Sequence, residues 1–127
     1  MKDYTAWIDK FMEGWRDRDV ERVMETIAED CAYYETVFDE PCRDIRAIRK
    51  LWEVVPKNQK DIEYSYEILA KNEEVCIIHF RLTRTTLPDE HRVEMDGIFQ
   101  VSLDDEGKCT LFKQWRFVRE LSYQTCS

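Results

Sequence analysis

The spacing of apolar residues changes once along the chain, near residue 60. Before that point apolar residues recur every three or four positions, which is typical of amphipathic helices. After it they alternate with polar residues, which is typical of half-buried strands. The sequence therefore predicts an α+β protein in which helices pack on one face of an antiparallel sheet.

Three helices are predicted in the first part. One covers residues 4–17, Asp19 caps a second, and Asp44 caps a third that Pro56 ends. Between the second and third helices, β-forming residues at 32–37 predict a short strand, which "DEPC" breaks. The apolar stripes of the three helices are Tyr4, Trp7, Ile8, Phe11, Met12 and Trp15; Val20, Val23, Met24 and Ile27; and Ile45, Ile48, Leu51, Trp52 and Val55.

Four further strands follow as a meander: "DIEYSYEIL", "EVCIIHFRLTRT", residues 92–103 and "CTLFKQWRFVREL". Gly107, in the last turn, suits the positive φ of a bulged hairpin. If Asp104 pairs with Lys108 around that turn, the last two strands are in register from there. The register then sets Asp96 opposite Arg116, Ile98 opposite Gln114, Val101 opposite Leu111 and Met95 opposite Phe117.

Asp96 and Gly97 interrupt an otherwise apolar strand, where both residue types are disfavoured. The predicted register places Asp96 on a polar face with Arg116 and with His79 or Arg81. Two interpretations stay open: an ion pair across strands, or a polar group aimed into a ligand cavity. A bulge in the last strand would reverse its faces. Gly97 either lets the sheet bend or lets a ring or ligand approach the backbone.

The composition agrees with a folded domain, since 43% of the residues are hydrophobic and 13% are aromatic. The formal net charge is −8 with no basic stripe, which argues against nucleic acid as a partner. No apolar run is long enough to span a membrane, and the N-terminus lacks the apolar centre of a signal peptide. We expect a single cytoplasmic domain covering residues 1–127.

The cysteines and histidines give no metal-binding or cofactor-binding pattern. The five cysteines, Cys31, Cys42, Cys76, Cys109 and Cys126, are widely spaced and odd in number, which suits reduced thiols. The two histidines, His79 and His91, lie in no metal-ligand spacing. The sequence therefore predicts neither a metal site nor a bound cofactor.

Three stretches resemble the nuclear transport factor two-like superfamily and its SnoaL-like branch: "DRDVERVMETIAEDCAYYE", "FDEPCRDIRAIRKLW" and "MDGIFQVSLDDEGKCTLFKQW". The resemblance spans nearly the whole chain. It implies a cone-shaped, cystatin-like roll in which a curved antiparallel sheet wraps around the N-terminal helices and encloses an apolar pocket. It also implies a homodimer through the outer face of the sheet.

Enzymes of this superfamily carry out acid–base chemistry on small apolar molecules. The base of ketosteroid isomerase would fall near Glu35 and Thr36 and its oxyanion acid near Phe99, and neither Thr36 nor Phe99 can supply such a group. Asp96 with Arg81 or Arg116 resembles part of the Asp-Arg-Asp relay of limonene epoxide hydrolase. Asp96 is therefore the candidate catalytic residue, supported by His79, Arg81 and Arg116.

The resemblance leaves three functions open. The first is a protein that binds a small apolar molecule without catalysis; the second is an acid–base enzyme such as a hydrolase, dehydratase, cyclase or isomerase; the third is a protein-interaction module. The pocket of the first two would be lined by aromatic residues. The candidates are Trp15, Tyr33, Phe38, Trp52, Tyr64, Tyr66, Phe80, Phe99 and Trp115.

Overall fold

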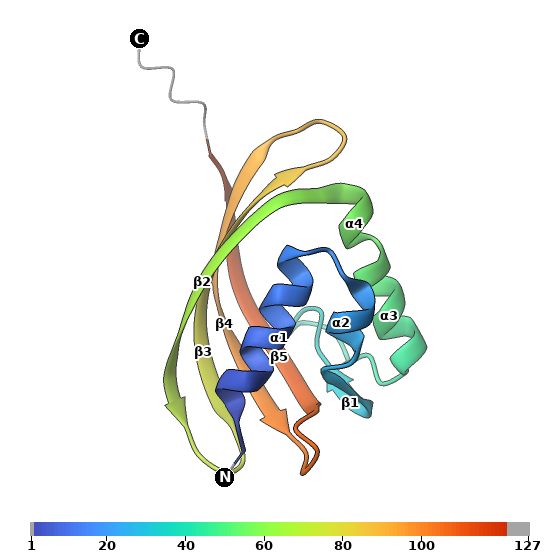
Figure 1. Cartoon of the computed structure of the whole chain (residues 1–127), viewed down its shortest axis with the longest axis vertical. Coiled ribbons are helices and arrows are strands. Elements are labelled where there is room, and N and C mark those ends of the chain that lie inside the picture. The colour runs from blue at the N-terminus through green and yellow to red at the C-terminus, as the bar shows by residue number, and fades with distance from the viewer. Residues whose placement is uncertain (1, 122–127) are drawn as a thin grey trace.

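A curved sheet wraps around helix α1 (Tyr4–Arg16) in the computed structural model, which describes residues 2–121 (Figure 1). The strand order is β1-β5-β4-β3-β2, and the helices cover the concave face. The α+β class and the cone-like roll are confirmed. The remaining helices are α2 (Val20–Met24), α3 (Ile45–Glu53) and α4 (Val55–Asn58), and the strands are β1 (Ile27–Tyr33), β2 (Gln59–Lys71), β3 (Cys76–Thr86), β4 (Arg92–Leu103) and β5 (Cys109–Glu120).

The sheet is mixed, which corrects the prediction of a purely antiparallel one. Strands β2 to β5 form the predicted antiparallel meander, whereas β1 pairs with β5 in parallel. The chain can reach this arrangement because α3 and α4 lie between β1 and β2 and carry it back across the concave side (Figure 1).

The start of β1 differs from the sequence prediction. Ile27 belongs to β1 and not to the second helix, which ends at Met24. The Thr26 hydroxyl donates to the Val23 carbonyl over 2.6 Å, and the Trp7 indole N–H donates to the Thr26 carbonyl over 2.9 Å. These bonds satisfy backbone groups at the helix end, so the chain can leave the helix there.

Residues 34–37, predicted as strand, form a loop instead. Tyr33 and Cys42 close its ends by exchanging backbone hydrogen bonds of 2.9 and 2.7 Å. The third predicted helix is two helices: α3 ends at Glu53, and Val55 and Pro56 open α4. Proline is tolerated there because the first turn of a helix needs no N–H donor.

Aromatic packing joins α1 to both α3 and the sheet. The Phe11 ring lies 5.3 Å from the Trp52 ring on α3 and 5.9 Å from the Phe99 ring on β4, measured between centroids. Phe80 and Phe99 stack at 4.0 Å and are fully buried. This core fixes the position of α1 over the concave face, and the candidate site lies at its edge.

A β-bulge at Thr110 changes the register of β4 and β5. Leu103 pairs with Cys109 but Ser102 pairs with Leu111, so one extra residue enters β5. Asp96 therefore lies opposite Phe117, and the predicted pairing with Arg116 is wrong. The bulge reverses the predicted faces of β5: Phe112, Gln114, Arg116 and Val118 lie along the concave pocket wall, whereas Trp115 and Phe117 lie on the convex side.

Gly97 is required for close approach between β4 and its neighbours. A Cβ atom at this position would lie 2.3 Å from the Trp115 carbonyl oxygen and 2.9 Å from the Phe80 ring. Only glycine leaves room for both contacts. Of the two interpretations of Gly97, the structure supports the close approach of a ring and a strand.

Candidate functional site

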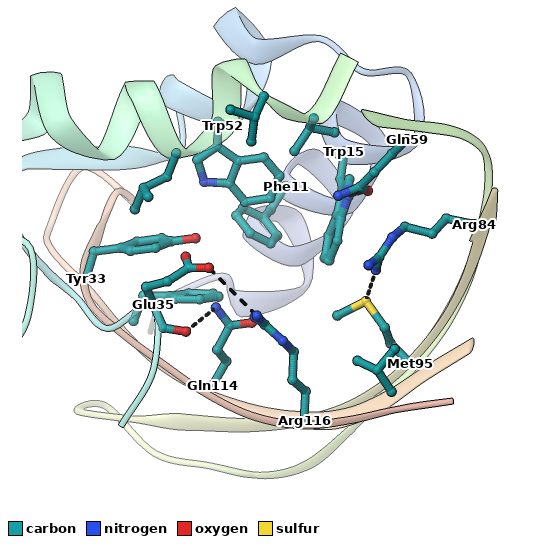
Figure 2. A pocket seen from close by; sticks show the side chains of 15 residues that line it. Phe11, Trp15, Tyr33, Glu35, Trp52, Gln59, Arg84, Met95, Gln114 and Arg116 are labelled. Carbon is teal, nitrogen blue, oxygen red and sulfur yellow. Dashed lines mark hydrogen bonds and ion pairs between the residues drawn. The ribbon is translucent and has the colours of Figure 1, made fainter. Parts of the chain in front are cut away.

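A pocket of about 190 Å³ lies between the helices and the concave face of the sheet (Figure 2). Helices α1, α3 and α4 supply one side, and β3, β4 and β5 supply the other. Apolar and aromatic side chains make most of the wall, and a few polar side chains point into the space. The lining residues that the argument uses are Phe11, Trp15, Tyr33, Glu35, Trp52, Gln59, Arg84, Met95, Gln114, Arg116 and Val118.

Three aromatic rings from α1 and α3 form the apolar side of the pocket. The Trp52 ring stands nearly perpendicular to those of Phe11 and Trp15, each at a centroid distance of 5.3 Å. The Trp15 indole N–H donates to Gln59 Oε1 over 2.9 Å. The Trp52 indole Nε1 is buried and has no hydrogen-bond partner within residues 2–121.

Glu35 reaches the pocket from the loop after β1. The backbone bonds between Tyr33 and Cys42 hold this loop, and Gln114 Nε2 donates to the Glu35 carbonyl over 3.3 Å. The Glu35 carboxylate lies 3.7 Å from Arg116 Nη2. Burial raises the pKa of Tyr33, with the nearby Glu35 charge as a smaller cause, so the Tyr33 hydroxyl stays protonated. The Glu35 carboxylate and the Tyr33 hydroxyl thus lie at the same end of the pocket.

Arg84 enters the pocket from β3. Its Nη1 group contacts the Met95 sulfur, whereas its Nε group is buried without a partner among the described residues (Figure 2). Desolvation lowers the pKa of Arg84, and the charge of Arg116 adds to this effect. The charged residues of the lining are Arg84, Arg116 and Glu35, so the pocket carries one excess positive charge.

Three of the nine predicted pocket residues line the pocket: Trp15, Tyr33 and Trp52. Phe80 and Phe99 lie in the closed core beside it. Both residues point to the concave face, as predicted. Their stacked rings pack in the core and do not line the pocket.

The other four predicted residues lie elsewhere. Tyr64 and Tyr66 project from β2 beside α1, where Arg16 lies over the Tyr64 ring and the Tyr66 hydroxyl donates to Asp9. Phe38 is 94% exposed on the loop after β1. Trp115 points to the convex side because of the bulge at Thr110.

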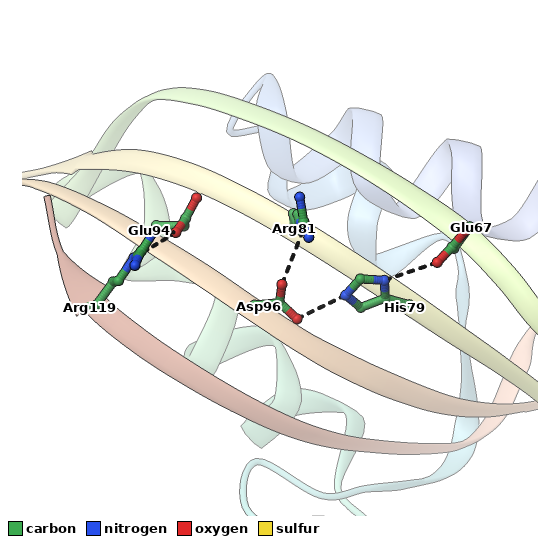
Figure 3. A network of polar contacts seen from close by, with 6 residues as sticks. All are labelled: Glu67, His79, Arg81, Glu94, Asp96 and Arg119. Atoms are coloured by element: carbon green, nitrogen blue, oxygen red, sulfur yellow. Dashed lines mark hydrogen bonds and ion pairs between the residues drawn. The ribbon is translucent and has the colours of Figure 1, made fainter.

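Asp96 lies on the convex face, away from the pocket (Figure 3). His79 Nε2 is 2.8 Å from Asp96 Oδ1, and Arg81 Nε donates to Oδ2 over 3.1 Å. His79 Nδ1 is 3.2 Å from Glu67. The hydrogen bond with His79, followed by Arg81, lowers the pKa of Asp96, and the two carboxylates raise the pKa of His79.

The predicted catalytic group is therefore divided between the two faces of the sheet. His79, Arg81 and Asp96 come together on the convex side, and Arg116 faces Glu35 in the pocket. This placement favours the ion-pair interpretation of Asp96 over the catalytic one.

Glu35, Arg84 and Gln114 line the pocket and are not among the residues that the sequence predicts there. A signal for Arg84 was present, because it continues the inward alternation of Cys76, Ile78, Phe80 and Leu82 along β3. The bulge at Thr110 put Gln114 and Arg116 on the wrong face in the sequence prediction, although Lys113 on the predicted apolar face was a sign of it.

A metal site and a membrane-spanning helix are both absent from residues 2–121. No group of three His, Cys, Asp or Glu residues there is placed to hold a metal ion. No helix in that range is long and apolar enough to cross a membrane. Cys31, Cys42, Cys76 and Cys109 are unpaired thiols, and Cys126 lies outside the described residues.

The family model of the SnoaL-like domain matches residues 8–112, which is most of the chain. The chain belongs to the SnoaL-like family. The predicted membership of the nuclear transport factor two-like superfamily is thereby confirmed. No curated protein sequence matches this SnoaL-like chain significantly.

Solved structures similar to this SnoaL-like protein show the same fold. SalBIII, an epoxide hydrolase/cyclase-like enzyme of pyran ring formation in salinomycin, has a TM-score of 0.79 at 13% identity over 92% of this chain and 95% of its own. A Mycobacterium sp. Δ5-3-ketosteroid isomerase has 0.75 at 13% identity over 94% and 100%. A limonene epoxide hydrolase-like enzyme of M. tuberculosis has 0.68 at 17% identity over 88% and 80%.

Proposed function

We propose that this SnoaL-like protein binds a small, largely apolar molecule in the pocket between α1, α3 and β5. The observation that carries the proposal is a concave, aromatic-walled space into which a few polar groups converge. Such spaces are typical of small-molecule sites. At about 190 Å³ it is smaller than the roughly 300–1,000 Å³ of drug-sized pockets, which points to a ligand of about one ring.

A pocket-filling variant tests this proposal with p-cresol as the probe. Val118 lines the pocket and is 51% exposed, so Val118→Trp can cover the entrance without entering the core. Leu69→Trp, on an exposed position of β2, is the matched control. We expect calorimetry to show p-cresol binding to the wild type and to Leu69→Trp, and at least about tenfold weaker binding to Val118→Trp. Equal affinity for all three proteins would contradict the proposal.

A second candidate function is acid–base catalysis in the same pocket. It is favoured by Glu35, whose carboxylate reaches the cavity beside Arg116 and within the same wall as Tyr33. A carboxylate in this position can accept a proton from water or from a bound molecule. The structural relatives that act on epoxides and ketosteroids share the fold, and the proposal extends their class of chemistry, not their substrates, to this chain.

The catalytic candidate is tested by the hydrolysis of styrene oxide, a small apolar epoxide. Glu35→Gln should lower any turnover by roughly 10²–10⁴-fold, the usual effect of losing a positioned acid or base, and leave p-cresol affinity unchanged. Glu40→Gln, on the same loop and exposed, is the control. Turnover by Glu35→Gln at the wild-type rate would remove Glu35 as the catalytic group.

We also propose that the protein forms a homodimer through the convex face of the sheet. Phe117 is 85% exposed there and Trp115 is 42% exposed, and both flank the ion pairs of Asp96 with His79 and Arg81. Exposed aromatic residues beside polar groups are typical of interface centres. A second copy of the chain is the partner that this proposal names.

A further inference from the structure

We infer that the ligand of the pocket carries a single carboxylate, which Arg84 binds, on a small apolar or aromatic body. This inference rests on the proposed function, because it names the class of molecule that the same pocket takes. The observation behind it is the environment of the Arg84 guanidinium group.

Arg84 is a half-buried cation without an anionic partner among residues 2–121. Its Nε atom is shielded from solvent and makes no hydrogen bond within residues 2–121, and its Nη1 group contacts only the weak acceptor sulfur of Met95. No ion pair within residues 2–121 includes Arg84, whereas Arg92 on β4 and Arg116 on β5 each lie within 4.0 Å of a carboxylate. Partial desolvation of an unpaired charge costs some stability, and a bound anion would offset that cost.

Among the charged side chains of the pocket lining, Glu35 and Arg116 pair with each other and Arg84 has no counter-charge. Arg116 lies 3.7 Å from Glu35, so this pair is internally compensated. The remaining polar lining groups carry no charge at neutral pH: the Tyr33 hydroxyl and the amides of Gln59 and Gln114. One positive charge is therefore in excess, in a chain whose formal net charge is −8. A monoanion neutralises this excess, and a second negative charge would again be unpaired.

The shape of the pocket decides which monoanion fits. The planar guanidinium fork matches a carboxylate through two parallel hydrogen bonds. Figure 2 shows Arg84 and Arg116 extending into the cavity from the sheet side, and Trp15 and Trp52 facing them from the helices. A molecule of about one ring can thus place its carboxylate at Arg84 and its apolar body against the two indoles.

The experiment compares p-toluate with p-toluamide, which have nearly the same shape but differ in charge. Calorimetry on the wild type should give an affinity for p-toluate about tenfold or more above that for p-toluamide, since a charge-assisted hydrogen bond is lost with the amide. Arg84→Met keeps the aliphatic stem and should remove this preference. Arg84→Lys should keep part of it, and the exposed Arg46→Met should keep all of it.

Four other results of these binding experiments would overturn the inference. Equal affinity for both compounds overturns the inference and leaves the proposed function intact. Binding of neither compound also overturns the inference, and the proposed function fails with it only if p-cresol does not bind either. A carboxylate preference that survives in Arg84→Met assigns the anion to another residue and overturns the inference. Displacement of p-toluate by inorganic phosphate at the same concentration would show a general anion site, and it also overturns the inference.

Thermal unfolding gives a second readout that does not depend on affinity. Without ligand, Arg84→Met should melt at or above the wild-type temperature, because it removes an unpaired charge that is partly desolvated. p-Toluate should raise the melting temperature of the wild type and not that of Arg84→Met. A clearly lower melting temperature for Arg84→Met without ligand would show that Arg84 has a structural role, and would overturn the inference.

Discussion

His79 shows how single residues on the two faces of the sheet take different roles. On the convex face it lies between the carboxylates of Asp96 and Glu67, and its pKa is raised as that of Asp96 is lowered. On the concave face, Arg84 lies in a drier place with no carboxylate beside it. In the first arrangement each charge has a partner, whereas in the second the cation has none among the described residues, which is the basis of the proposed ligand site.

The His79–Asp96 pair predicts a pH-dependent stability. A raised pKa means that the contribution of His79 is full below about pH 6.5 and is lost as pH rises through the folded pKa. The lowered pKa of Asp96 gives stability above about pH 3.9, which is lost as pH falls through its folded pKa. His79→Gln should therefore destabilise the protein more at about pH 5.5 than at about pH 8.5 in urea unfolding. An equal loss at both pH values would contradict the pairing.

Asp96→Asn distinguishes the two interpretations of Asp96. Because the carboxylate accepts from His79 and Arg81 on the convex face, the variant should melt at a lower temperature and bind p-cresol as the wild type does. An unchanged melting curve together with lost ligand binding or turnover would favour the catalytic interpretation instead.

At the scale of elements, the apolar stripes of the helices could be predicted because apolar residues recur there every three or four positions. The stripe of α1 is buried as predicted, and Ile48 and Trp52 of α3 are buried as well. The side of the sheet to which each residue of β5 points was predicted wrongly, because one extra residue at Thr110 reverses that side for every later residue. The start of β1 was missed because α2 ends through two hydrogen bonds of Thr26, one to Val23 three residues earlier and one from Trp7, which is distant in sequence. The pocket was thus predicted by its helical side and missed on its sheet side.

Trp52→Ala tests the packing of α3 against α1. The Trp52 side chain is buried and contacts the rings of Phe11 and Trp15, so its removal leaves a large cavity. We expect a loss of roughly 3–5 kcal/mol in the free energy of unfolding, measured with urea. A loss below about 1 kcal/mol would show that α3 is not held through this residue.

Gly97→Ala tests the approach of β4 to β5. The added methyl group would lie 2.3 Å from the Trp115 carbonyl oxygen, which belongs to the backbone and cannot turn away. The strands must separate, and we expect roughly 1–3 kcal/mol of destabilisation. A variant as stable as the wild type would mean that β4 and β5 are farther apart than described.

At the scale of the whole molecule, the curvature of the sheet separates two faces that carry different kinds of side chain. The helices cover the concave face (Figure 1), and the pocket lies between them and the sheet. The convex face carries the Asp96 ion pairs (Figure 3), and the exposed Trp115 and Phe117 lie on the neighbouring strand β5. The fold is common to enzymes of several activities, so it does not by itself fix a reaction.

The proposed dimer is tested by sedimentation at micromolar concentration. We expect a species of twice the 15.4 kDa chain mass, with roughly 1,200–2,000 Å² buried in total. Phe117→Lys should yield the monomer, whereas Leu69→Lys, at an exposed site on β2, should not. A wild type that sediments only at 15.4 kDa would contradict the dimer.

The most direct test of ligand binding in the pocket uses the four tryptophan indole N–H signals in an NMR titration with p-cresol. Trp15 and Trp52 line the pocket, whereas Trp7 donates to the Thr26 carbonyl outside it and Trp115 lies on the convex face. We predict that the signals of Trp15 and Trp52 shift with a common saturation curve while those of Trp7 and Trp115 stay in place. Shifts confined to Trp115, or no saturable shift at Trp15 and Trp52, would contradict the assignment of the pocket as the binding site.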